Sequence, residues 1–341
     1  MTPILQLGLG PIGQGIVRRL LARSDSAIVG AVDPAPDKAG RSVAEVLGLA
    51  PSDPGAKAAR ALRVAPSLAE ALAQAAQRPT VAVHATSSFL SQVAPQLVEA
   101  AEHGLNVVST CEELAYPWRH HPDEARAIDE AARRAGVTIL GTGVNPGFVM
   151  DFLPVCLAGA AASVSHVHVE RVVDAGSRRG PLKRKVGAGL TPDAFQAQAA
   201  TGTFGHIGLV ESVAMIAAAF GWSLDQITSD LQPKIAQEPY ESPDLTVPPG
   251  HVLGIDQVAV GLDEQGEERI RLHLQMYVGA PNPHDTIRLQ GEPPLELTIP
   301  RGTPGDLATA AAVINAIPNV LAASPGLKTV IDLPPARWRQ P

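Results

Sequence analysis

"QLGLGPIGQG", the segment from Gln6 to Gly15, decides the fold of the amino-terminal half of the chain. It has the spacing G-x-G-x-x-G, and it stands after an apolar run and before a stretch with helical periodicity. In that context the glycines permit a tight turn, close approach of a pyrophosphate and close packing of helix on strand, and the helix N-terminus attracts the phosphates. The segment therefore predicts a dinucleotide site whose contacts come from Gly8, Gly10, Pro11, Ile12 and Gly13.

The residues after the next apolar run predict which dinucleotide binds. "AIVGAVD" ends at Asp33, 20 residues after Gly13, where a carboxylate accepts hydrogen bonds from the adenosine ribose and repels a 2′-phosphate. NAD(H) is therefore favoured. Lys38 and Arg41 follow closely and would soften that preference, so NADP(H) remains an alternative cofactor. The other interpretation is a glycine turn in a fold that no longer binds a nucleotide.

Length, charge and cysteine content limit the class of protein. The chain has 341 residues, which suggests two domains, and a net charge of −7, which argues against a nucleic-acid-binding protein. Cys111 and Cys156 are too few for a disulfide framework and are expected to be free thiols in a reducing compartment. We see no apolar run long enough to span a membrane and no signal sequence, so we expect a cytoplasmic protein without a membrane partner.

Hydrophobic periodicity predicts the fold class and the domains. Residues 1–146 alternate short apolar runs with helical segments, which is typical of a doubly wound parallel sheet of the Rossmann type. Residues 147–302 contain helices and runs that alternate with period two, which predicts a second α+β domain with a mainly antiparallel sheet for substrate binding and dimerisation. A long apolar helix over 303–324 is expected to dock back on the first domain.

Ligands of open parallel sheets lie beyond the carboxyl ends of the strands, and this places several residues near a nicotinamide. Thr86 and Ser87 follow "VAVHA", Cys111 follows "NVVST", and Asn145 lies in "GTGVNPG". Asn145 would hold a carboxamide or a substrate, or would serve as a turn residue before Pro146. Cys111 has no histidine near it in sequence and is read as a small residue beside the cofactor rather than a nucleophile.

Two adjacent acids in "STCEELAYPW", Glu112 and Glu113, stand just beyond the same strand end. They are either ordinary acids at a helix start, or one of them faces the nicotinamide C4 while the other caps a helix or meets a base. A carboxylate beside a hydride acceptor suits an amine substrate, because it holds an ammonium group and accepts its proton.

Four segments together resemble a known family. "GTGVNPGFVMD", "STCEELAYPW", "RVVDAGSRRGPLKRKVGAGLT" and "GHIGLVES" are similar to the 2,4-diaminopentanoate dehydrogenases and native amine dehydrogenases, whose fold resembles that of dihydrodipicolinate reductase. The resemblance implies a homodimer that uses NAD(P) to deaminate amines oxidatively to carbonyl compounds, or catalyses the reverse reductive amination with ammonia. It also implies that the catalytic glutamate lies in "CEE"; Glu112 is favoured and Glu113 is the alternative.

The same segments leave the substrate open. The paired histidines and following lysine of dihydrodipicolinate reductases are absent, although another NAD(P) reductase of that type, or of the homoserine dehydrogenase type, and a non-catalytic nucleotide sensor remain as alternatives. A diaminopentanoate substrate would need cations for its carboxylate, for which the candidates are Arg171, Arg178, Arg179 and Lys185; these residues could equally serve the dinucleotide, the dimer or solubility.

Three further residues have both a pocket-lining and a structural interpretation. Phe148 and Met150 would shape an apolar pocket or pack in the core, and His206 would line the pocket or cap a helix. His166 and His168 alternate on one strand face, but no third ligand is evident, so no metal is predicted.

Overall fold

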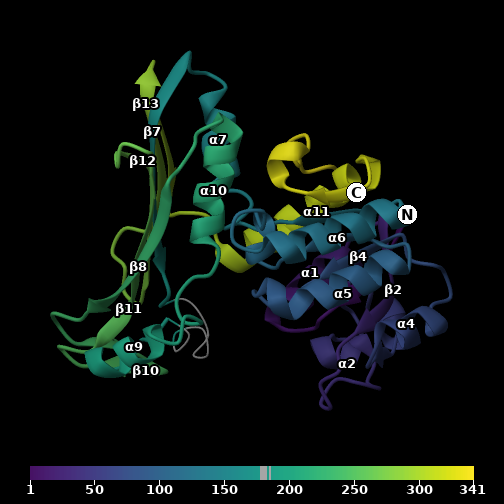
Figure 1. Ribbon diagram of the computed structural model, residues 1–341. Helices are drawn as coiled ribbons and strands as arrows, with labels where there is room; N and C mark the ends of the chain where they lie inside the picture. The colour runs from purple at the N-terminus through teal and green to yellow at the C-terminus, as the bar shows by residue number, and fades with distance from the viewer. Residues whose placement is uncertain (177–182, 184–185) are drawn as a thin grey trace. The chain divides into compact units, whose positions relative to one another are not determined.

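The computed structural model describes residues 1–176, 183 and 186–341 (Figure 1). The chain divides into two compact units. Unit 1 contains Met1–Gly147 together with Pro304–Pro341, and unit 2 contains Phe148–Thr303. Each division lies one residue from the corresponding boundary expected from the sequence.

Unit 1 is built on a seven-stranded parallel sheet with the order β15-β6-β5-β4-β1-β2-β3. Its strands are β1 (Thr2–Leu7), β2 (Ser26–Val32), β3 (Val64–Ala65), β4 (Val81–His84), β5 (Asn106–Ser109), β6 (Thr138–Gly141) and β15 (Gly326–Lys328). The strand order reverses beside β1, between β1 and β4, which is the point where doubly wound sheets bind ligands. The predicted α/β fold class is confirmed; the short strands β3 and β15 were not predicted.

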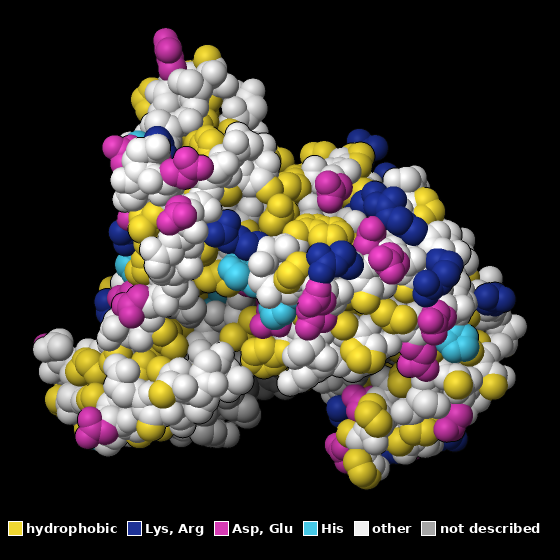
Figure 2. All heavy atoms as spheres, in the orientation of Figure 1, with side chains coloured by type: hydrophobic (Ala, Val, Ile, Leu, Met, Phe, Trp, Pro, Cys, Tyr) yellow, Lys and Arg dark blue, Asp and Glu magenta, His cyan; other side chains and the backbone are white. Residues whose placement is uncertain are grey.

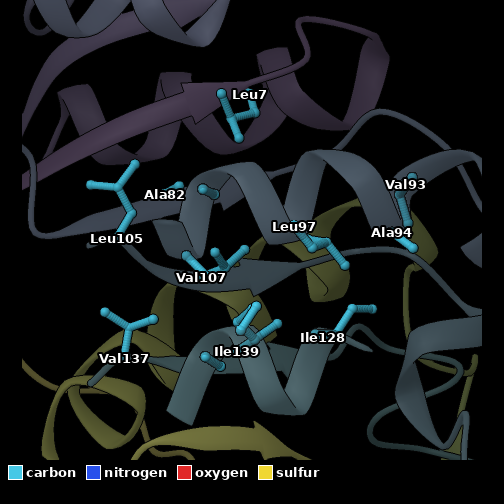
Figure 3. Close-up of a cluster of buried hydrophobic side chains, with 14 of the residues drawn as sticks. Leu7, Ala82, Val93, Ala94, Leu97, Leu105, Val107, Ile128, Val137 and Ile139 are labelled. Atoms are coloured by element: carbon cyan, nitrogen blue, oxygen red, sulfur yellow. The ribbon is translucent and has the colours of Figure 1, made fainter. Parts of the chain in front are cut away.

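Helices cover both faces of this sheet (Figure 1). They are α1 (Pro11–Leu21), α2 (Val43–Leu47), α3 (Ala56–Ala61), α4 (Leu68–Gln74), α5 (Leu90–Glu102), α6 (Pro122–Ala135) and α11 (Gly305–Ala322), with the short 3₁₀ turns η1 (Glu113–Ala115) and η2 (Val330–Asp332). The paired helices α5 and α6 enclose one apolar cluster, in which Leu97 and Ile128 of the helices pack with Val107 and Ile139 of the strands (Figure 3). The helices α1 and α11 pack together away from that cluster.

The helix α11 is longer and more apolar than the sequence-based expectation about membrane spans allowed. Its 18 residues have a mean hydropathy of 1.3, so by length and composition alone it could cross a membrane, contrary to our expectation that no run was long enough. It packs against α1 and the strands β4, β5 and β6, and buries residues such as Val313, Ile317 and Val320. One face of α11 is therefore buried in unit 1, which accounts for the apolar residues on that face. It begins two residues after the predicted start and ends two residues before the predicted end.

Unit 2 is a six-stranded sheet with the order β14-β13-β7-β12-β11-β8. Its elements are α7 (Phe152–Ala158), β7 (Ser163–Asp174), α9 (Pro192–Ala199), α10 (Leu209–Phe220), β8 (Gln226–Ile235), β11 (Val252–Leu262), β12 (Glu268–Tyr277), β13 (His284–Glu292) and β14 (Leu295–Pro300), with a separate ribbon of β9 (Tyr240–Ser242) and β10 (Leu245–Val247). Every neighbouring pair is antiparallel except β7 with β12. The predicted mainly antiparallel sheet is therefore confirmed, and α10 packs on β8, β11 and β12.

A buried ion pair anchors the chain where it leaves unit 2. Arg171 of β7 is 2% exposed and lies opposite Asp285 of β13. One guanidinium nitrogen donates to Asp285 Oδ1 at 2.7 Å, and the other donates to the carbonyl oxygen of Thr303 at 2.7 Å. The Thr303 N–H donates to Asp285 Oδ2 at 2.7 Å. Arg171 was predicted as a candidate for binding a substrate carboxylate; the structure gives it an internal carboxylate instead.

We predict that Arg171→Met lowers the free energy of unfolding by about 3–5 kcal/mol, because it leaves the buried Asp285 carboxylate without its cation. Chemical denaturation measures the loss. The matched control is Arg288→Met, which removes a half-exposed arginine from β13 that bonds to Glu296 at 3.1 Å. Exposed pairs contribute about 0–1 kcal/mol, so the control should change little. Equal losses in the two variants would contradict the assignment of Arg171.

Candidate functional site

Two glycines at the turn from β1 into α1 are required by the packing of the protein itself: Gly8 in the loop and Gly13 in the first turn of the helix. Gly8 has φ +85°, and a Cβ there would lie 2.4 Å from the carbonyl oxygen of Ala85. A Cβ on Gly13 would lie 2.1 Å from the carbonyl oxygen of Gly8, so only glycine lets α1 approach the strand end this closely. A Cβ on Gly10 would meet no atom within 4 Å. Gly10, the N-cap of α1, thus borders open space at a helix N-terminus, which fits a pyrophosphate.

A buried polar residue of β1 stabilises this loop by hydrogen bonds to its backbone. Gln6 is fully buried, and its Nε2 donates to the carbonyl oxygen of Gly8 at 2.9 Å and to that of Leu7 at 3.2 Å. This role of Gln6 was not predicted from the sequence. Its signal was a polar side chain in an otherwise apolar strand, directly before the glycine motif.

Asp33 at the end of β2 is held as a carboxylate by three donors. Its Oδ2 accepts from the Leu9 N–H at 2.9 Å and from Lys38 Nζ at 2.8 Å, and its Oδ1 accepts from the Ala35 N–H at 3.0 Å. Burial raises the pKa of Asp33, but the hydrogen bonds from Lys38, Ala35 and Leu9 outweigh it, so the pKa lies below its ordinary value. Lys38 is thus paired with Asp33, whereas Arg41 donates to the carbonyl oxygen of Asp37 at 3.1 Å.

Thr86 and Ser87, which follow β4, are tied to glutamines of α5. Thr86 Oγ1 donates to Gln96 Oε1 at 3.0 Å, and Ser87 Oγ donates to Gln92 Oε1 at 2.6 Å. Since β4 and β5 are parallel neighbours, both residues lie at the same sheet edge as the residues that follow β5. The two glutamines were not recognised from the sequence.

The structure separates the two adjacent acids. Glu113 Oε2 accepts from the N–H of Leu90, the first residue of α5, at 2.6 Å, and His121 Nε2 lies 3.4 Å from the same oxygen. Glu113 therefore caps a helix, although the helix is α5 rather than one that it begins itself. Glu112, the N-cap residue of η1, comes one residue earlier and is partly exposed. Both acids therefore lie just beyond the end of β5, and the contacts of Glu113 tie that segment to α5.

Cys111 and Gly141 fix the position of this segment. Cys111 is buried and its thiol donates to the carbonyl oxygen of Ser88 at 3.2 Å; burial raises the pKa of the thiol, so it stays protonated and is a poor nucleophile. A Cβ on Gly141 would lie 2.6 Å from the backbone carbon of Leu114, so this glycine lets η1 lie against the end of β6. This role of Gly141 was not predicted from the sequence.

Asn145 lies in the loop that follows β6. It is 9% exposed, and the loop is closed by Gly147, whose φ is +119° and where a Cβ would lie 2.5 Å from the Gly143 nitrogen. The loop is thus built by its own backbone packing. Asn145 belongs to unit 1, together with the residues after β1, β4 and β5.

The candidate substrate-binding residues of unit 2 differ in how far they are buried. Met150 is fully buried, in keeping with a place in the core, whereas Phe148 is 38% exposed and remains a candidate for a pocket wall. The backbone of His206 is held by Gln257, which accepts from its N–H at 2.9 Å and donates to its carbonyl oxygen at 3.0 Å. Arg178 lies outside the described residues, as do Arg179 and Lys185.

A buried pair that the sequence analysis missed joins two helices of unit 2. Ser212 of α10 donates to Asp151 Oδ2 at 2.7 Å, and Asp151 Oδ1 accepts from the Phe152 N–H at the start of α7. Both residues stand in the quoted segments "GTGVNPGFVMD" and "GHIGLVES". Within those two segments, this bond ties the start of α7 to α10. Over the described residues, no group of three histidine, cysteine or acidic side chains could hold a metal ion.

Two family models match this chain. Residues 148–338 match the 2,4-diaminopentanoate dehydrogenase C-terminal domain, and residues 4–140 match the saccharopine dehydrogenase NADP binding domain. The chain is 32% identical to a 2,4-diaminopentanoate dehydrogenase of Acetoanaerobium sticklandii over 98% of this chain and 94% of that one. It is 24% identical to an amine dehydrogenase of Streptomyces virginiae over 96% and 94% of the two chains.

Among solved structures, an amine dehydrogenase from Mycobacterium smegmatis has a TM-score of 0.84 and 27% identity, covering 99% of this chain and 98% of that one. The resemblance predicted from four segments is thus confirmed at the level of the whole chain. The chain belongs to the 2,4-diaminopentanoate dehydrogenase family.

Proposed function

We propose that this chain is an NAD(P)-dependent amine dehydrogenase that converts an amine to a carbonyl compound and ammonia, and catalyses the reverse reductive amination. The observation that carries the proposal is the position of Glu112. It follows β5 at the sheet edge that also bears the glycine loop, and its neighbour Glu113 is occupied in capping α5. The 32% identity to a 2,4-diaminopentanoate dehydrogenase supports the reaction class.

The residues of unit 1 fit a dinucleotide. Gly8, Gly10 and Gly13 leave the N-terminus of α1 open for the pyrophosphate, and Asp33 stands where it can accept from a ribose hydroxyl. Thr86, Ser87 and Asn145 are proposed contacts on the nicotinamide side. When bound, the oxidised cofactor supplies a hydride acceptor at C4 of its nicotinamide ring.

Glu112 would act twice as a base. Its carboxylate accepts a proton from the substrate ammonium group, which frees the nitrogen lone pair to form a C=N bond as hydride leaves the adjacent carbon. The product is an iminium ion. Glu112 then returns its proton to solvent and takes one from a water that attacks the iminium carbon. Collapse of the resulting carbinolamine releases ammonia and leaves the carbonyl compound.

The substrate could be a simple amine or 2,4-diaminopentanoate itself. Arg171, one of the cations proposed to meet a substrate carboxylate, is paired with Asp285 in the core of unit 2. That pairing weakens the case for a carboxylate-bearing substrate, whereas the identity to the Acetoanaerobium enzyme favours it. A panel of ketones, aldehydes and 2-amino-4-oxopentanoate, each with NADH or NADPH and with or without ammonium, tests both readings. Cofactor oxidation that does not depend on ammonium would refute the proposal in favour of a different NAD(P) reductase.

We predict that Glu112→Gln lowers kcat by about 100-fold or more, because a general base contributes roughly that factor, while the Kd for NADH changes by less than about threefold. Glu113→Gln is the matched control. Its amide oxygen can still accept from Leu90, so turnover should fall less than about tenfold while the melting temperature drops. Steady-state kinetics and NADH fluorescence measure both. Near-wild-type turnover in Glu112→Gln would show that the catalytic assignment is wrong.

The Asp33–Lys38 pair is proposed to set cofactor choice, with NAD(H) favoured and NADP(H) accepted. We predict that Asp33→Asn shifts the ratio of kcat/KM towards NADPH by about tenfold, because it removes a charge that repels the 2′-phosphate. Lys38→Met should shift the same ratio towards NADH, because it leaves the Asp33 charge uncompensated. Shifts in the same direction in both variants would contradict this account.

We also propose that the protein is a cytoplasmic homodimer. The resemblance implies the dimer, and the free thiols of Cys111 and Cys156 suit a reducing compartment. Basic and acidic side chains are interspersed on the face shown in Figure 2, in keeping with small-molecule rather than nucleic-acid partners. Sedimentation equilibrium should give twice the chain mass of 35.5 kDa. A monomer at micromolar concentration would contradict the dimer.

A further inference from the structure

We propose that His84 is a positioning residue that couples the loop bearing Thr86 to the segment bearing Glu112. The inference rests on the proposed function, because it assigns these two segments to the cofactor and to the reacting amine. His84 is the last residue of β4 and is fully buried. Nothing in the glycine motif or in the family resemblance pointed to it.

The imidazole of His84 is bonded on both sides. Its Nδ1 lies 2.8 Å from Ser109 Oγ, and its Nε2 lies 3.0 Å from Gln96 Oε1 and 2.9 Å from Thr86 Oγ1. Ser109 is the last residue of β5, so the ring bridges the carboxyl ends of two adjacent strands. Both ends lead directly into the segments with proposed function.

The hydrogen-bond partners fix which ring nitrogen carries the proton. Gln96 Nε2 donates to the carbonyl oxygen of Gln92 at 3.3 Å, which turns Gln96 Oε1, an acceptor, towards His84. His84 Nε2 must therefore be protonated, and Nδ1 must accept. The Ser109 hydroxyl donates to Nδ1, and its oxygen accepts from the Cys111 N–H at 3.1 Å. A directed chain of hydrogen bonds thus runs from Cys111 through Ser109 and His84 to Gln96.

The hydrogen bonds on the two sides of the His84 ring hold different segments. We call the bond between Nδ1 and Ser109 the Ser109 arm, and the bonds of Nε2 with Gln96 and Thr86 the Nε2 arm. The Ser109 arm fixes the backbone of Cys111, which is the residue before Glu112. The Nε2 arm fixes Thr86 and the first turns of α5. Burial lowers the pKa of His84 to about 4, so the ring stays neutral near pH 7 and acts through its hydrogen bonds rather than through charge. A small displacement of a positioned catalytic group is enough to lower turnover strongly.

Two conservative variants of His84 each keep the hydrogen bonds on one side of the ring and remove those on the other. In His84→Asn the amide oxygen stands near the place of Nδ1 and can accept from Ser109, but the side chain no longer reaches Gln96 and Thr86. In His84→Gln the amide nitrogen stands near the place of Nε2 and can donate to Gln96, but Ser109 loses its acceptor. Ser109→Ala removes the acceptor of the Cys111 N–H and should behave as His84→Gln does.

We expect His84→Gln and Ser109→Ala to lower kcat by about tenfold or more with the Kd for NADH nearly unchanged, because only the Glu112 segment loosens. We expect His84→Asn to keep kcat within about threefold while the Kd for NADH rises, because the Thr86 loop loosens instead. A merely structural role would lower the melting temperature in all variants without separating kcat from NADH binding. Absence of that separation would overturn the proposal.

A second readout does not depend on turnover. Long-range ¹H–¹⁵N NMR spectra of the full-length protein should show His84 as the neutral Nε2–H tautomer, with no titration between about pH 5.5 and 8. The Nδ1–H tautomer, or a titration in that range, would overturn the proposal. If the wild-type protein binds NADH but turns over no amine or ketone of the panel, the proposed function fails while the spectra and the NADH affinities of the His84 variants still decide the role of His84.

Discussion

The close approach of α1 to the carboxyl end of β1 is the constraint on which the cofactor site depends. A methyl group on Gly13 would lie 2.1 Å from the Gly8 carbonyl oxygen, and one on Gly8 would lie 2.4 Å from the Ala85 carbonyl oxygen. Both glycines are needed because backbone atoms lie too close for a side chain. Buried Gln6 stabilises the same turn by donating to the carbonyl oxygen of Gly8. Only Gly10 is left to face a ligand. The loop is thus rigid before the cofactor arrives, which reduces the ordering cost of binding.

We propose that a division of roles between two neighbouring acids adapts this nucleotide site to amine chemistry. Glu113 satisfies the first N–H of α5, which holds the segment after β5 against the helix that follows β4. Gly141 lets η1 rest on the end of β6. Glu112 therefore lies in a segment that is held on two sides, and we propose that the hydrogen bonds of His84 and Ser109 hold it on a third. Preorganisation of this kind is what a catalytic carboxylate needs in order to discriminate reactive geometries.

Much of the fold was readable from the sequence because its signals are local. The glycine spacing, the 20-residue interval to Asp33 and the alternation of strands and helices each lie within a short window. The resemblance favoured Glu112 over Glu113, but the helix-capping bond that Glu113 accepts from Leu90 was not readable, since Leu90 lies 23 residues earlier in the chain. The partner of Arg171 was not readable for the same reason, because Asp285 is 114 residues away. Met150 was left between a pocket wall and the core, and the structure buries it fully.

Other omissions have a compositional cause. The strands β3 and β15 contain two and three residues, too short for any periodicity to stand out. The helix α11 has the composition of a membrane span, yet one of its faces packs against the parallel sheet of unit 1. Buried polar residues such as His84, Gln6 and Ser109 were passed over because only their partners, brought close by the sheet, give them a role.

The most direct test of the account is a crystal structure of the enzyme with oxidised cofactor and a bound amine that reacts slowly. The account predicts that the Glu112 carboxylate lies within about 3.5 Å of the amine nitrogen, directly or through one water, with the substrate carbon over the nicotinamide C4. A complex in which another side chain holds the nitrogen, and Glu112 points away from it, would contradict the account.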